Sequence, residues 1–165
     1  MTAAFSLPET HKIVQMTAAQ ESAGGTVTST YVSLKNAHKA WIIISYATAG
    51  NAETFTPLKA TAVAPTNATN ITNVVKIWSN LDTAASDTLV ERTAATTYAC
   101  DDAATSKLII FEIDPADLGD LLGVPYDCIG LYCNAPNAAD YITVTCWIQP
   151  RYASQVSAQP TALTD

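Results

Sequence analysis

The residues that have the right chemistry for catalysis are few and lie far apart in the sequence. Two acidic pairs, Asp101 with Asp102 and Asp114 with Asp117, have the residue type that glycoside cleavage needs. Asp101 and Asp102 fall in a predicted turn, where Asp is common for structural reasons. Asp114 directly precedes Pro115, which is typical of a helix N-terminus, and Asp117 suits the positive end of the helix dipole. Structural roles therefore account for both pairs.

The two histidines have no sequence neighbours that would make them a catalytic base or a metal ligand. His11 adjoins the N-terminal segment, and His38 lies in a predicted polar turn with Lys35 and Lys39, where a histidine is usually solvated. A glycine-rich phosphate loop and the GxSxG motif of serine hydrolases do not occur. We therefore expect no catalytic residues and no cofactor, and we expect that the protein is not an enzyme.

Cysteine thiolates are common metal ligands, but the spacing of the four cysteines does not favour a metal site. None is in CxxC spacing, and both histidines lie far from them in the sequence. If residues 126–133 form one strand, two of the cysteines are five positions apart and point to opposite faces. Buried reduced thiols are the favoured interpretation, a disulfide or a metal site is the alternative, and no metal is expected. The four residues are Cys100, Cys128, Cys133 and Cys146.

Composition narrows the class of protein. The chain has 165 residues, the size of one ordinary domain, with 14% charged residues, a net charge of −7 and an isoelectric point near 4.6. Because its eight basic residues are scattered, we expect no nucleic-acid binding. No apolar run approaches the roughly 18 residues of a membrane span, and no signal peptide is visible. We expect synthesis in a bacterial cytoplasm and no membrane partner.

The elements that would position these residues are β-strands, organised around residues 30–47. Within that stretch, Trp41 to Ile44 is apolar without a polar gap, which predicts that both faces of the strand are covered, by the core or by another subunit. The clearest alternation spans residues 141–149. It places four side chains on the opposite face from the others: Ile142, Val144, Cys146 and Ile148.

These patterns predict an all-β fold, an antiparallel β-sandwich or jelly roll of about eight or nine strands. One short helix is expected near residues 115–122, started by Asp114 and Pro115 and stopped by Gly123 and Pro125. Residues 1–11 and 151–165 lack a core-forming period and are predicted to be extended arms. Residues 12–150 would form the single domain.

The aromatic residues suggest where another subunit would bind. Trp41, Trp78 and Trp147 are each embedded among aliphatic residues, which favours the core over a ligand platform. Tyrosine, however, is common at subunit contacts, and the second face of the Trp41 strand needs a cover. The candidate interface residues are Trp41, Ile43, Tyr46, Tyr132 and Tyr141.

The amino-acid sequences of several segments are informative when they are taken together. YVSLKNAHKAWIIISYA, IWSNLDTAASDTLVERTAATTY, FEIDPADL, YDCIGLY and WIQPRYA together resemble a family of small virion structural proteins of tailed bacteriophages. The resemblance covers about Tyr31 to Tyr152. None of these segments is a catalytic or binding motif, so the resemblance transfers no functional residues. It implies a particle component, with a head decoration (cement) protein as the favoured role.

Such a role carries specific expectations. A decoration protein would bind the major capsid protein on the capsid surface as a homo-oligomer, with a trimer favoured because closed symmetry would cover the second face of the central strand. Two alternatives remain open. A tail-tube or connector component would form rings that stack, and a carbohydrate-binding jelly-roll module of a host-attachment structure would show exposed aromatic residues and measurable glycan affinity.

Overall fold

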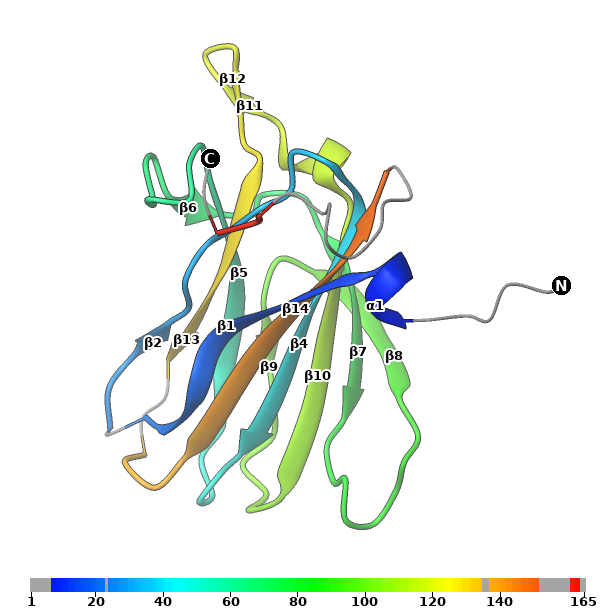
Figure 1. The fold of residues 1–165 in the computed structure, drawn as a ribbon. Helices are drawn as coiled ribbons and strands as arrows, with labels where there is room; N and C mark the ends of the chain where they lie inside the picture. Colours follow the sequence, from blue (N-terminus) through cyan, green and yellow to red (C-terminus); the bar gives the residue numbers. More distant parts are fainter. Residues whose placement is uncertain (1–6, 23, 135–136, 152–160, 164–165) are drawn as a thin grey trace, which may run out of the picture.

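The computed structural model describes residues 7–22, 24–134, 137–151 and 161–163, and it shows an all-β sandwich (Figure 1). Two antiparallel sheets, here named sheet A and sheet B, pack against each other, and a small hairpin projects beyond them. The predicted fold class is therefore confirmed. The architecture places one broad sheet face outward on each side of the sandwich.

Sheet A contains the longest strands. Its order is β1 (Lys12–Glu21), β14 (Tyr141–Pro150), β4 (Ala37–Ala47), β10 (Ser106–Ile113), β7 (Val75–Asn80) and β8 (Val90–Ala95), and every neighbouring pair is antiparallel. The central strand predicted from the apolar run is β4, which pairs with β14 on one side and β10 on the other.

Sheet B is built from shorter strands. Its order is β2 (Val27–Thr28), β13 (Cys128–Asn134), β5 (Thr54–Ala60) and β6 (Thr69–Asn70), with β3 (Val32–Ser33) also on β13 and β9 (Tyr98–Ala99) also on β5. Many of these strands have only two residues. They raise the number of strands above the expected eight or nine without changing the architecture.

The core lies between the two sheets and follows the predicted alternation. On β14 the four residues assigned to one face, Ile142, Val144, Cys146 and Ile148, are all buried. On β4, Ile42 and Ile44 are fully buried, and Tyr46 packs its ring edge-on against Phe55 of sheet B at 5.3 Å between centroids. The period-two pattern thus determines which side chains meet in the core.

The predicted helix begins where expected but is shorter. The 3₁₀ helix η1 (Pro115–Leu118) starts after Asp114, whose side chain accepts a hydrogen bond from the Ala116 amide at 3.0 Å. It ends at Gly119, which has a positive φ of 72°. The residues expected to continue the helix instead form a projecting hairpin, β11 (Asp120–Leu121) and β12 (Val124–Pro125) (Figure 1).

The two predicted arms are partly described. The helical turn α1 (Leu7–Thr10) precedes β1, and residues 1–6 lie outside the described part of the chain. Near the other end, the Ser33 amide donates to the Ala162 carbonyl at 2.8 Å, and Ala162 is buried. This C-terminal stretch therefore contacts the sandwich, while residues 152–160 and 164–165 lie outside the described part.

Candidate interaction surface

The outer face of sheet A carries a group of apolar side chains that project away from the core. Strand register brings them together from five neighbouring strands. All are partly exposed, and the isoleucine on β1 is 46% exposed. We name this group the outer patch; its members are Ile13, Trp41, Ile43, Trp78, Ile110 and Trp147.

The outer patch is arranged in two rows. In the first row Trp147 stands directly between Ile13 and Trp41, because β14 pairs with β1 on one side and β4 on the other. In the second row Ile110 stands between Ile43 and Trp78. Side chains at paired positions on one face of a sheet lie close enough to touch. The rows therefore form one continuous apolar surface.

Charged and aromatic groups border the outer patch. The Lys39 ammonium donates to Glu112 at 2.6 Å, beside Trp41 on the same face. This hydrogen bond raises the pKa of Lys39 and lowers the pKa of Glu112. The His11 ring lies 5.9 Å from the Trp41 ring, so the residue after α1 shields one edge of that tryptophan. The patch is thus apolar in the middle and polar at its rim.

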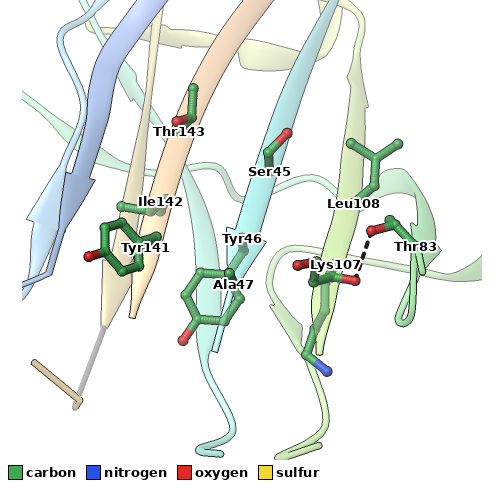
Figure 2. Close-up of a pocket in the computed structure, with 10 residues that line it drawn as sticks. Ser45, Tyr46, Ala47, Thr83, Lys107, Leu108, Tyr141, Ile142 and Thr143 are labelled. Atoms are coloured by element: carbon green, nitrogen blue, oxygen red, sulfur yellow. Dashed lines mark hydrogen bonds between the residues drawn. The ribbon is translucent and has the colours of Figure 1, made fainter. Parts of the chain in front are cut away.

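A shallow depression of about 380 Å³ lies at the β10 and β14 end of the same sheet, and Figure 2 shows its lining. The lining is hydroxyl and apolar in character, with Thr83 donating to the Ser106 carbonyl at 3.2 Å. This depression adds polar and small side chains at one end of the outer face. Its lining residues are Ser45, Tyr46, Ala47, Thr83, Ser106, Lys107, Leu108, Tyr141, Ile142 and Thr143.

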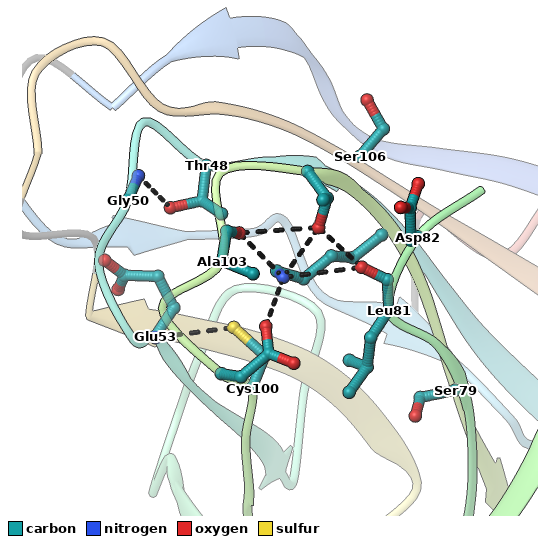
Figure 3. Close-up of polar contacts among 12 residues, drawn as sticks. Thr48, Gly50, Glu53, Ser79, Leu81, Asp82, Cys100, Ala103 and Ser106 are labelled. Carbon is teal, nitrogen blue, oxygen red and sulfur yellow. Dashed lines mark hydrogen bonds and ion pairs between the residues drawn. The ribbon is translucent and has the colours of Figure 1, made fainter. Parts of the chain in front are cut away.

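The ammonium group of Lys107 has a structural role. It donates to Asp101 at 2.5 Å, to Thr105 at 2.9 Å and to the Ala103 carbonyl at 3.0 Å, and its side chain is fully buried. These bonds join the turn before β10 to the strand itself, and Figure 3 shows this region, with the contact of the labelled Ala103 drawn as a dashed line. Asp101 is therefore held in an ion pair within this turn.

A second polar group lies in the core between the sheets. Tyr46 donates to Asp140 at 2.8 Å, and the Ala49 amide donates to the other oxygen of the same carboxylate at 2.6 Å. Glu53 is fully buried, and among the residues that the structure describes none is a hydrogen-bond partner of its carboxyl oxygens. Burial, and then the charge of Asp140, raises the pKa of Glu53 to about 7. Because Glu53 and Asp140 are both fully buried, neither carboxyl group is placed to meet a substrate.

The structure distributes the five predicted interface residues over different environments. Trp41 and Ile43 lie in the outer patch. Tyr141 is 52% exposed at the end of the same sheet and donates to Glu21, whereas Tyr132 is partly exposed on β13 of sheet B. Tyr46 faces the core and is buried, because its parity on β4 is opposite to that of Trp41, so it is not available to an interface.

Four members of the outer patch were not among the predicted interface residues. The sequence predicts Trp78 and Trp147 in the core, and this is wrong: the structure places both on the outer face with partial exposure. Ile13 and Ile110 were not singled out. The sequence does contain information on Trp147. It alternates along β14 with Thr143 and Thr145, on the face opposite the buried residues, which indicates the outer face.

The cysteines are all free and buried. Cys133 belongs to the main core, and Cys128 belongs to a separate small cluster on the other side of sheet B, so the predicted opposite orientation of these two residues is confirmed. Within the described ranges, no group of three or more Cys, His, Asp or Glu side chains has an arrangement suited to a metal ion. Among the same residues, no helix is long and apolar enough to cross a membrane.

Comparison with known proteins gives one structural similarity. No protein-family model matches the chain, and no curated protein matches its sequence. The fold is similar to the crystal structure of SPBc2 prophage-derived protein YomS, with a TM-score of 0.46 and 5% sequence identity. That match covers 84% of this chain and 91% of the other. The fold and the exposed face together describe a small β-sandwich protein with an apolar aromatic surface on one sheet.

Proposed function

We propose that this protein is a virion structural protein of a tailed bacteriophage, and that it decorates the outside of the head as a homo-oligomer bound to the major capsid protein. The observation that carries the proposal is the outer patch, which places three tryptophans and three isoleucines on a partly exposed sheet face. Exposed apolar surfaces of this kind mark protein contacts. The sequence resemblance to small virion proteins supports the proposal that the protein is a component of a phage particle.

The size of the face suits a stable contact. The central strands β14 and β4 have 10 and 11 residues. The other four strands have 10, 8, 6 and 6 residues. With a rise of about 3.3 Å per residue and about 4.8 Å between strands, the six strands together cover roughly 800 Å². A standard protein interface buries about 800 Å² on each partner. The outer face of sheet A is therefore large enough to support one complete interface, and a closed trimer is the favoured assembly.

The role proposed is structural and not enzymatic. Asp114 caps η1, Asp101 pairs with Lys107, and the carboxyl groups of Glu53 and Asp140 are buried, so these acidic residues have structural explanations. The net charge of −7 favours display on a particle surface over contact with DNA. Both properties agree with a protein whose work is to bind other protein subunits.

The test compares the wild-type protein with two charge substitutions. Light scattering on a sizing column gives the oligomeric state, and co-sedimentation with heads assembled without this protein gives the affinity. Ile43→Asp places a carboxylate in the outer patch, and we expect it to remain folded but to lose oligomers and at least 10-fold in head affinity. Thr28→Asp, which adds the same charge at an exposed position of sheet B, should behave as wild type.

Three results would count against the proposal. A wild-type monomer that does not sediment with heads would refute the decoration role. If the protein forms rings of six subunits that stack and do not bind heads, a tail-tube role would replace the decoration role. If Ile43→Asp keeps both the oligomer and the head affinity, the outer patch is not the contact.

A second candidate function is favoured by one observation, the alignment of Trp41 beside Trp147 on the outer face of sheet A. Partly exposed aromatic rings suit stacking against sugar rings, so a carbohydrate-binding module of a host-attachment structure is the alternative. Titration with host cell-wall polysaccharide, followed by tryptophan fluorescence, separates the two. Saturable glycan binding that Trp147→Ala abolishes, in a protein that ignores heads, would favour the carbohydrate-binding role.

A further inference from the structure

The hairpin formed by β11 and β12 projects from the end of the sandwich (Figure 1), and several of its side chains are apolar and exposed. At its tip Leu122 is 98% exposed, and its neighbours Val124 and Leu121 are 52% and 36% exposed. These side chains do not belong to the core, and they lie on a different part of the molecule from the outer patch. The hairpin therefore needs an explanation of its own.

The backbone at the tip makes the choice of leucine unusual. Leu122 and Gly123 form the two-residue turn, and both have positive φ, 53° and 85°. Such a turn favours Asn-Gly, because asparagine tolerates the left-handed conformation and a branched apolar residue does not. The side chain of Asp120 accepts a hydrogen bond from the Gly123 amide at 3.1 Å, which stabilises the turn. In the free protein, leucine at this position is unfavourable in both conformation and exposure.

The base of the hairpin is held by contacts from distant parts of the chain. The buried Lys59 ammonium donates to the Leu118 carbonyl at 2.7 Å and lies 4.4 Å from the centre of the Tyr126 ring. Lys59 thus contacts the residues on both sides of the hairpin. The Asn73 side chain donates to the Asp117 carbonyl at 2.6 Å, and the Tyr126 amide donates to the Gly119 carbonyl at 3.0 Å. These bonds give the tip a defined position relative to the sandwich.

Charge around the hairpin indicates the partner. Asp114, Asp117 and Asp120 are exposed on the hairpin and the helix before it. From residue 114 through 125 the chain contains these three acids and no Lys or Arg. An acidic neighbourhood is repelled by an anionic lipid surface and attracted by basic side chains. The charge pattern therefore favours a protein over a membrane.

We propose that the hairpin inserts Leu122 into an apolar pocket, bordered by Lys or Arg, on the major capsid protein. The proposal rests on the proposed function for its choice of partner. Contact with an apolar pocket would bury the side chain that is now exposed, and basic residues at the rim would face Asp117 and Asp120. The hairpin would then act as a second contact, separate from the outer patch.

The experiment uses Leu122→Asn, which keeps the turn and removes the apolar side chain. Because asparagine suits the left-handed conformation, the melting temperature of the free protein should be unchanged or higher. Affinity for heads assembled without this protein should fall at least 10-fold in co-sedimentation. The control Leu89→Asn changes a leucine that is 37% exposed elsewhere, and it should bind as wild type.

Two further measurements test the stated chemistry. Asp117→Asn should weaken head binding several-fold at low salt and much less at high salt, because it removes one charge that faces the basic rim. Vesicles of phosphatidylglycerol and phosphatidylcholine should not bind the wild-type protein. If the wild-type protein binds vesicles and Leu122→Asn abolishes that binding, the partner is a membrane and the proposal is wrong. If Asp117→Asn binds heads at low salt as tightly as wild type, the pocket does not have the proposed basic rim.

The outcomes separate this inference from the proposed function. If wild type and Leu122→Asn bind heads equally, the hairpin contact is wrong and the decoration role stands. If the wild-type protein does not bind heads at all, both the decoration role and the proposed partner of the hairpin are wrong. A melting temperature that falls sharply in Leu122→Asn would show that leucine stabilises the free hairpin, which removes the reason for the proposal.

Discussion

The outer faces of the two sheets differ in how their apolar residues are covered. On sheet B, Tyr31 packs over Ala60 and Cys128 in a small buried cluster. Gly130 makes room for it, since a Cβ atom there would lie 3.0 Å from the Tyr31 ring. On sheet A, the described residues leave the outer patch partly exposed. The fold can cover an outer face with its own residues, so the uncovered face is the one available to a partner.

The largest expected effect tests this difference through two aromatic residues. Tyr31→Ala removes a buried ring and should lower the free energy of unfolding by about 3 kcal/mol, as for other buried aromatic residues. Trp41→Ala removes a partly exposed ring and should cost about 1 kcal/mol in the monomer. Urea unfolding at concentrations where the protein is monomeric gives both values. Equal losses would show that sheet A is covered as completely as sheet B.

An effect of intermediate size concerns the interior: the buried carboxyl group of Glu53 should make the free energy of unfolding depend on pH. The pKa of Glu53 is raised to about 7, above its ordinary value of 4.5. Between these values the folded state holds a proton that the unfolded state has lost, so the free energy of unfolding falls as pH rises from about 4.5 to 7 and levels off above it. The expected decrease is on the order of 2 kcal/mol.

Glu53→Gln should remove this pH dependence, because glutamine stays neutral at every pH. Glu91→Gln, at an exposed position on β8, is the matched control and should keep it. Urea unfolding of the monomer at several pH values between 5 and 8 measures the change. A stability that rises over this interval in the wild type, or that falls equally in Glu53→Gln, would contradict the assignment to Glu53.

The smallest expected effect concerns the rim of the outer patch. Lys39→Met removes the hydrogen bond to Glu112 and should cost less than about 1 kcal/mol, because both side chains are partly exposed. The pKa of Glu112 should rise toward its ordinary value, and NMR titration of the carboxyl group measures it. Lys76→Met removes a charge from the same face and should raise this pKa less. Equal shifts would mean that charge alone, without the hydrogen bond, accounts for the lowered value.

Much of the sandwich was predictable from local pattern. Alternation over residues 141–149 identified both the strand and its buried side, and Asp114 with Pro115 identified the start of η1. These predictions succeed because side chains alternate between faces along a strand and because capping depends on neighbouring residues. The apolar run from Trp41 to Ile44 likewise indicated a central strand with two apolar faces.

The sequence by itself thus determined the fold class and the two alternating faces of β14. Only the tertiary structure decided which apolar face stays uncovered, because coverage depends on segments far apart in the chain, such as Tyr31 over Cys128. It also decided that Tyr46 is buried, and that the stretch after Leu118 becomes a hairpin, which Lys59 holds at its base. Local periodicity specifies two faces for a strand, but long-range packing determines what covers each of them.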